Sequence, residues 1–154
     1  DRIPGVAAVA ALAEPTRRRL YDHVVRSPAP VSRDEAATAT EADIHTALFG
    51  ESPTAFCHVA ELDGEVVGFA LWFLNFSTWL GKPGIYLEDL FVRPQARGTG
   101  LGKALLTTLI DIARERGYGR VEWSVLDWNT PAQDFYRALG ATPNDEWTVW
   151  RFTP

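Results

Sequence analysis

The chain has 154 residues, 46% hydrophobic and 23% charged, a composition typical of one compact domain with a substantial core. Its formal net charge of −5 argues against a general nucleic-acid-binding protein, and no apolar run is long enough to span a membrane. The single cysteine, Cys57, excludes an internal disulfide framework and indicates a reducing, cytoplasmic setting. The Ala-rich stretch at residues 3–13 imitates a secretion signal only weakly.

The first third of the chain is predicted to be helical. Pro15 suits the first turn of a helix over residues 17–26. Capping-box patterns that begin at Ser32 and Thr40 predict two further short helices. No strand is evident in this part of the sequence.

Strands are predicted from residue 54 onward. The apolar segments 54–62 and 65–76 flank Asp63-Gly64, the dipeptide pattern that most strongly favours a tight hairpin. A break at residues 81–84 then precedes a further strand over residues 85–92.

The second half alternates helices with strands. A long amphipathic helix is expected over residues 100–116, followed by a strand over 120–126. A second helix opens at Asn129 and ends before Gly140, and a last strand is expected over 146–152. A strand on each side of a helix implies a parallel pairing, mixed here with antiparallel hairpins.

Three glycines at alternate positions, Gly98, Gly100 and Gly102, lie where the third strand meets the long helix. Backbone N–H groups at the start of a helix lack intrahelical partners, and glycines let several of them converge on one anion. Arg97 adds a positive charge at the same place, so the loop suits a phosphate or pyrophosphate. The alternative is a helix N-terminus with flexible glycines and no ligand.

Two familiar phosphate motifs are excluded by spacing. A P-loop would need glycine at Arg97 and a hydroxyl residue at Ala104. The dinucleotide motif would need glycine at Lys103.

Residues 95–100, QARGTG, resemble the Q/R-x-x-G-x-G/A loop of the GNAT superfamily of acetyl-CoA-dependent N-acetyltransferases. Residues 129–141, NTPAQDFYRALGA, resemble the family's N-x-x-A-x-x-F-Y-x-x-x-G-F/A segment. The similarity is closest to the diamine acetyltransferase branch, through WLGK at 79–82, YLEDLFV at 86–92 and EW at 146–147.

The resemblance runs from about Thr38 to the C-terminus and implies an acetyltransferase domain over residues 38–154. The fold it implies is α/β (α+β), with a mixed, mostly antiparallel twisted sheet flanked by helices. Residues 1–37 are expected to form an atypical helical segment that replaces the usual first strand and helix. Their stretch 11–37 resembles the opening helices of arsenical-resistance-type winged helix-turn-helix regulators, although no recognition helix follows. We expect these helices, or a second copy in a homodimer, to cover the open sheet edge.

The resemblance also implies how acetyl-CoA is held. Strand residues would pair with its pantetheine arm and the glycine loop would take its pyrophosphate, while Asn129 either caps its helix or touches the ligand. The residues implied in binding acetyl-CoA are Leu90, Phe91, Val92, Arg97, Gly98, Thr99, Gly100, Leu101, Gly102, Lys103 and Asn129.

Two residues are implied in catalysis. Glu88 is the expected base, acting through water, and its alternative is a strand carboxylate paired with a nearby cation. Tyr136 is the expected acid that protonates the leaving thiolate, and its alternative is core packing beside Phe135. Asp89 should point to the opposite face of the strand from Glu88, unless a bulge brings it to the substrate side.

The acceptor implied is a small amine of the diamine type, with no nucleic acid, membrane or metal involved. Trp79 and Trp147 are expected to face its cationic groups, together with Asp89 and Glu146. Ser77 departs from the acidic residue that polyamine-specific members carry near Trp79, which leaves room for a smaller amine or an amino acid.

Other interpretations stay open at this point. Cys57 and His58 should face opposite sides of one strand, which is poor geometry for a nucleophile and its base. The competing functions are an acetyl-CoA-binding regulator without turnover, built on a helix-turn-helix relic, and a protein N-acetyltransferase.

Overall fold

In a computed structural model of the chain, which describes residues 6–8 and 39–154, a long hairpin forms the centre of the fold. Strands β2 (Phe56–Leu62) and β3 (Glu65–Ser77) pair antiparallel on either side of Asp63 and Gly64. These two residues have φ values of 51° and 79°, and a left-handed conformation at both central positions defines a type I′ turn. The hairpin predicted from the Asp-Gly dipeptide is confirmed.

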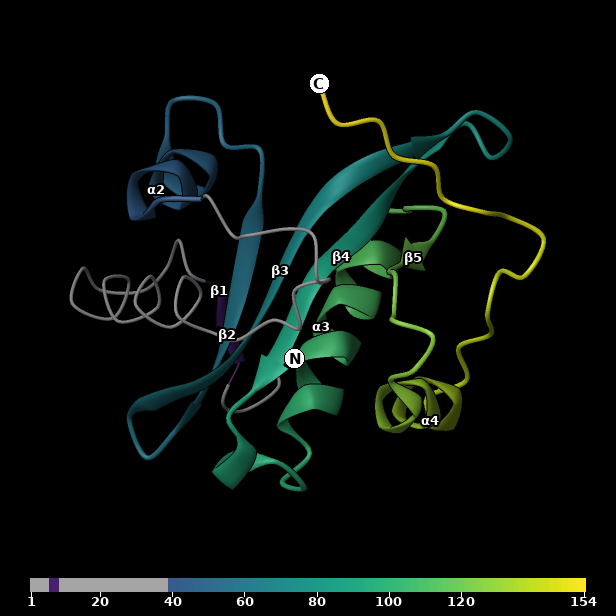
Figure 1. Cartoon of the computed structure of the whole chain (residues 1–154). Helices are drawn as coiled ribbons and strands as arrows, with labels where there is room; N and C mark the ends of the chain where they lie inside the picture. Colours follow the sequence, from purple (N-terminus) through teal and green to yellow (C-terminus); the bar gives the residue numbers. More distant parts are fainter. Residues whose placement is uncertain (1–5, 9–38) are drawn as a thin grey trace. The chain divides into compact units, whose positions relative to one another are not determined.

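Within the described residues, the sheet has five strands in the order β1-β2-β3-β4-β5 (Figure 1). Strands β1 (Val6–Ala8) to β4 (Lys82–Val92) pair antiparallel with their neighbours. The last strand, β5 (Val121–Glu122), pairs parallel with β4. Helix α3 (Leu101–Glu115) makes the connection between these two strands. The expected mixed, mostly antiparallel sheet flanked by helices is therefore confirmed.

Each face of the sheet carries a buried core. Helix α2 (Glu41–Phe49) begins with the predicted capping box, in which Thr40 and Asp43 bond each other's backbone N–H. Its residue Leu48 belongs to the core on one face, which consists of Leu48, Cys57, Val59, Val66, Phe69 and Leu71.

Helix α3 runs along the other face and packs against β4 and β3 (Figure 1). Its apolar stripe follows the predicted helical spacing, and Leu105, Leu106 and Leu109 are almost completely buried. Gly117, with a φ of 68°, follows the helix end, as expected for a left-handed C-terminal residue.

One side-chain pair on the α3 face contains a titratable histidine. The indole Nε1 of Trp72 donates a hydrogen bond of 3.1 Å to Nδ1 of His58. Burial and the charge of Arg116 lower the pKa of His58. Cys57, the adjacent residue, lies in the opposite core, which confirms that the two side chains face opposite sides.

We expect this pair to make stability fall in mild acid. The unfolded histidine has a pKa of about 6.5, so the stabilisation is present above that pH and is lost as pH falls toward the lower folded value. The slope is at most about 1.4 kcal/mol per pH unit for one proton. In His58→Gln the amide oxygen can still accept from Trp72, and urea denaturation at pH 7.5 and 5.5 should show a smaller loss than wild type. An equal loss in both proteins would contradict this assignment.

The expectation that the chain lacks a first strand is wrong. Val6–Ala8 pair with β2 through the register Val6↔Ala60, Ala7↔Val59 and Ala8↔His58. The Ala-rich sequence did not predict this strand, because alanine has a low β propensity. The strand forms because β2 supplies its hydrogen-bond partners. The helices predicted over 17–26 and from Ser32, and the helix-turn-helix resemblance of 11–37, lie outside the described residues.

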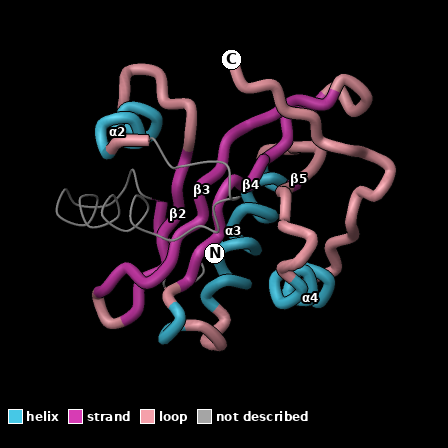
Figure 2. Tube along the Cα trace, in the orientation of Figure 1, coloured by secondary structure: helices cyan, strands magenta, loops and turns pink. Residues whose placement is uncertain are grey.

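The expected last strand over residues 146–152 is also wrong. Residues 124–154 form a separate compact unit, in which α4 (Thr130–Ala138) is followed by loop to the C-terminus (Figure 2). The strand expected over 120–126 is reduced to the two residues of β5. A strand needs a neighbour for its hydrogen bonds, and apolar alternation alone does not provide one.

Candidate functional site

A bulge in β4 places two carboxylates beside each other. In the β3–β4 ladder, Leu71 pairs with Asp89 and Trp72 pairs with Leu87, so Glu88 is the extra residue. Trp72 contacts His58 on the α3 face, whereas Leu71 belongs to the opposite core. Asp89 therefore faces the same side as Leu71, and the bulge brings Glu88 to that side as well.

The expectation that Asp89 points away from Glu88 is therefore wrong, and the alternative of a bulged strand holds. Burial, and next the charge of Glu88, raise the pKa of Asp89. Glu88 itself is exposed. The two carboxylates consequently differ in environment, with a solvent-facing one next to one that resists ionisation.

We expect Asp89→Asn to stabilise the fold at neutral pH. The folded state holds a proton on Asp89 more tightly than the unfolded chain, so its contribution falls as pH rises above about 3.8 through the raised pKa. Removing the charge should raise Tm by a few degrees at pH 7.5, with the gap closing toward pH 4. Differential scanning calorimetry across this range measures it. A gap that does not change with pH would refute the assigned cause.

Only the first half of β4 is paired with β5 along the strand edge that faces it. The parallel ladder consists of Ile85↔Val121 and Tyr86↔Glu122. In the described part of the chain, no strand pairs with β4 on this side from Leu87 to Val92. Leu90, Phe91 and Val92 thus lie where a ligand with amide groups could continue the ladder.

The glycine loop follows directly after β4. A short 3₁₀ turn, Pro94–Ala96, leads to Gly98 and Gly100, which have φ values of 79° and 86°. A Cβ on either glycine would meet open space within 4 Å, so the loop is exposed there. Glycine is needed at both positions for the left-handed backbone.

Helix α3 begins at this loop without a side-chain cap. Gly100 is its N-cap residue and offers no side chain, so the first N–H groups of Leu101, Gly102 and Lys103 point out of the helix end. An N-terminus of this kind carries partial positive charge and favours an anion. The residues present therefore fit a pyrophosphate.

Two side chains hold the loop in place. Thr99 Oγ1 donates a hydrogen bond of 2.6 Å to the carbonyl of Ala96. Arg97 donates from Nε to the carbonyl of Val92 at 3.0 Å, and its guanidinium lies 6.0 Å from the centre of the Phe91 ring. The terminal nitrogens of Arg97 thereby stay close to the end of β4.

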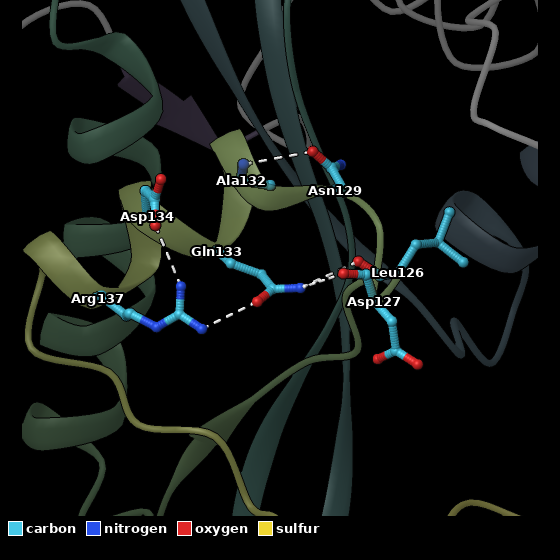
Figure 3. A network of polar contacts seen from close by, with 7 residues as sticks. All are labelled: Leu126, Asp127, Asn129, Ala132, Gln133, Asp134 and Arg137. Carbon is cyan, nitrogen blue, oxygen red and sulfur yellow. Dashed lines mark hydrogen bonds and ion pairs between the residues drawn. The ribbon is translucent and has the colours of Figure 1, made fainter.

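The second unit carries the other sequence motif. Asn129 Oδ1 accepts from the N–H of Ala132 at 3.3 Å, so it caps α4 as expected (Figure 3). Gln133 reaches back and donates to the carbonyls of Leu126 and Asp127. Arg137 bonds both Asp134 and Gln133, which ties one side of the helix together.

Tyr136 lies on this helix beside Phe135, with ring centres 5.3 Å apart in an edge-to-face arrangement. Burial raises the pKa of its phenol. The hydroxyl therefore stays protonated at neutral pH, so it has a proton to donate.

The expected substrate residues are distributed over both units. Trp79 lies in the turn between β3 and β4 and is 91% exposed. Glu146 and Trp147 belong to the second unit, where both are exposed. Glu88, Asp89 and the glycine loop belong to the first unit, where the end of β4 leads into the loop.

A polar cluster that the sequence did not single out lies on strands β3 to β5. Glu122 Oε1 accepts from Asn75 Nδ2 at 2.6 Å and lies 3.2 Å from a terminal nitrogen of Arg120. Asn75 Oδ1 is buried and has no hydrogen-bond partner among the described residues. An unmet buried acceptor costs about 1–3 kcal/mol. No motif marks these residues, and only the strand register shows that they share a face.

Comparison with known proteins gives a consistent result. A profile of the acetyltransferase (GNAT) family matches residues 18–141. Thialysine N-epsilon-acetyltransferase of Bos taurus is 41% identical over 115 residues, which cover 68% of this chain and 67% of that protein. L-ornithine N5-acetyltransferase NATA1 of Arabidopsis thaliana is 46% identical over 91 residues, covering 59% of this chain and 40% of that protein.

Among solved structures, an integron cassette protein from the mobile metagenome of V. cholerae superimposes with a TM-score of 0.68. It is 25% identical, and the match covers 97% of this chain and 91% of that one.

Proposed function

Since the chain belongs to the acetyltransferase (GNAT) family, we propose that it transfers an acetyl group from acetyl-CoA directly to a primary amine of a small, diamine-type acceptor. The observation that carries this proposal is the glycine loop, where two left-handed glycines open onto an uncapped helix N-terminus next to Arg97. Acetyl-CoA supplies the acetyl group as a thioester.

Acetyl-CoA is held by two features of the first unit in this proposal. The pyrophosphate lies against the N–H groups from Gly98 to Lys103, with Arg97 contributing charge. The open edge from Leu90 to Val92 bonds the amides of the pantetheine arm. Asn129 caps α4 and contributes indirectly, through the position of Tyr136.

Glu88 acts as the base. An alkylammonium with a pKa near 10.4 is only about one part in a few thousand neutral at pH 7, so a proton acceptor is needed before nitrogen can attack. The exposed carboxylate of Glu88 accepts that proton through water, and the ionised form of Asp89 beside it attracts the cationic acceptor.

Tyr136 acts as the acid. When the nitrogen bonds to the acetyl carbon and the C–S bond breaks, the phenol donates its proton to the leaving thiolate. The phenol is protonated at neutral pH, and its place in the second sequence motif supports this role.

The acceptor class is supported by the relatives, which are named for acetylation of thialysine and ornithine. The exposed rings of Trp79 and Trp147, with Glu146, offer further contacts to ammonium groups. No helix in the described ranges is long and apolar enough to cross a membrane. We further propose that the protein is cytoplasmic and forms a homodimer. The free, buried thiol of Cys57 supports a reducing compartment and has no bearing on the dimer. The domain boundary near residue 38 stays a prediction.

A transfer assay tests the proposal. Purified protein is incubated with labelled acetyl-CoA and a panel of amino acids with terminal amines, diamines, monoamines and lysine-containing peptides. We expect transfer to the small acceptors. Transfer to peptides alone would indicate a protein acetyltransferase, and acetyl-CoA binding without transfer to any amine would reject the enzyme and favour a regulator.

A further inference from the structure

The polar cluster of Asn75, Arg120 and Glu122 shares a sheet face with Glu88. Glu122 pairs with Tyr86, which lies two residues before Glu88 on β4. Directly paired strand residues share a face, and so do residues two apart in one strand. Asn75 pairs with Gly84, which lies two residues before Tyr86, and therefore belongs to the same face.

The cluster is built around a bare backbone position. A Cβ on Gly84 would lie 2.7 Å from Asn75 Oδ1 and 2.9 Å from Arg120 Cγ. Both side chains therefore lie directly over Gly84, where any larger residue would displace them. From there Asn75 and Arg120 reach the same carboxylate oxygen of Glu122.

The ion pair in this cluster is accessible from solvent. The side chains of Arg120 and Glu122 are 38% and 36% exposed. The two contacts to Glu122 use Oε1, and no hydrogen bond from the described residues reaches Oε2. A partly exposed carboxylate that is held in place suits an ammonium group, and a partly exposed guanidinium suits a carboxylate.

The distance from Glu88 suits a short acceptor. Strand spacing and rise place the Cα atoms of Glu88 and Glu122 roughly 8 Å apart. Tyr86 lies beside both of them, opposite Glu122 and two residues before Glu88, and its ring stacks on that of Phe73 on β3 with centres 5.1 Å apart. A chain of three or four methylene groups could pass along the Tyr86 side chain with one end at each carboxylate.

The charges favour one kind of head group. Arg120 and Glu122 together are neutral, so a neutral zwitterion gains from both of them. A lone ammonium is attracted by Glu122 but repelled by Arg120 a few ångströms away.

We propose that Arg120 and Glu122 bind the α-carboxylate and the α-ammonium of the acceptor, which is an α-amino acid with a terminal amine. This inference rests on the proposed acetyl transfer and makes the cluster its specificity site. Simple diamines are then poorer acceptors than the corresponding amino acids.

Three related acceptors test the two contacts separately. L-Ornithine carries both groups, putrescine lacks the carboxylate, and 5-aminopentanoate lacks the α-amine. Wild-type kcat/KM should be highest for ornithine. Arg120→Gln should lower it roughly 10- to 100-fold for ornithine and 5-aminopentanoate but not for putrescine, the range expected when a charged hydrogen bond is lost.

Glu122→Gln should have the complementary effect. We expect a loss for ornithine and putrescine, which carry the second ammonium, and little change for 5-aminopentanoate. Arg120→Lys should restore part of the ornithine activity, because it keeps the charge but loses the planar fork.

Matched controls separate recognition from folding. Arg114 forms a similar ion pair with Asp111 on the surface of α3, so Arg114→Gln should leave all three acceptors unchanged. Thermal melts identify any variant that does not fold, and the wild-type ranking of the three acceptors does not depend on variants.

Either of two results would overturn this inference while leaving the proposed acetyl transfer intact. One is transfer to putrescine as efficient as to ornithine, and the other is an equal effect of Arg120→Gln on all three acceptors. Absence of transfer from acetyl-CoA to any amine would overturn the proposed function as well.

Discussion

Glu88→Gln is expected to lower kcat/KM for the amine acceptor roughly 100- to 1,000-fold, the usual range for loss of one acid–base group. Glutamine keeps the size of the side chain but cannot accept the proton of the ammonium. The bulge should persist, because it depends on the pairing of Leu71 with Asp89 and of Trp72 with Leu87. Steady-state kinetics with acetyl-CoA and a fixed acceptor measure the effect.

The pH profile of Glu88→Gln gives a second readout. Without the base only neutral amine reacts, so the variant rate should rise about tenfold per pH unit between pH 7 and 9. The wild-type rate should rise less steeply. Glu115→Gln removes an exposed carboxylate near the end of α3 and serves as the control, with no expected change. Equal rates for Glu88→Gln and wild type would show that Glu88 is only a strand carboxylate.

Tyr136→Phe is expected to lower kcat roughly 100-fold with a smaller change in KM, because the phenol acts on the leaving thiolate and not on binding. Phenylalanine keeps the edge-to-face contact with Phe135, so α4 should stay folded. Tyr118→Phe is the matched control, since Tyr118 follows α3 and has no proposed role.

A loss of kcat that is the same for all acceptors would show that Tyr136 acts on the release of the thiolate. The loss in Tyr136→Phe should be similar for good and poor acceptors, since all of them release the same thiolate. A loss confined to one acceptor, or an unchanged kcat, would contradict the role of Tyr136 as the acid.

Local signals predicted the elements that depend on local chemistry. Asp63-Gly64 identified the hairpin, Thr40 and Asp43 identified the capping box of α2, and Asn129 identified the cap of α4. Each of these depends on residues within four positions of one another, so the sequence contains the necessary information.

Features that depend on pairing between distant strands could not be predicted. The bulge at Glu88 follows from the register of β3 against β4, and it reverses the expected direction of Asp89. Strand β1 was missed and the strand over 146–152 was overpredicted for the same reason. Whether an apolar segment becomes a strand is decided by the presence of a neighbour.

The polar cluster of Asn75, Arg120 and Glu122 could not be predicted from the sequence either. Asn75, Gly84 and Glu122 are separated by up to 47 positions in the chain, and no spacing rule connects them. Alternation could place Arg120 and Glu122 on one side of a strand, but it could not show that this side carries Glu88.

Calorimetric titration with acetyl-CoA and with S-acetylpantetheine, which lacks the diphosphate, tests most directly whether the glycine loop binds that group. We expect wild type to bind acetyl-CoA much more tightly, and Gly100→Ala to weaken that binding roughly tenfold or more while leaving the fragment unaffected. Gly64→Ala provides the control, since Gly64 has a similar φ of 79° and equally open surroundings, so alanine strains both positions alike. Equal affinity of wild type for the two ligands, or unchanged acetyl-CoA binding in Gly100→Ala, would contradict the account.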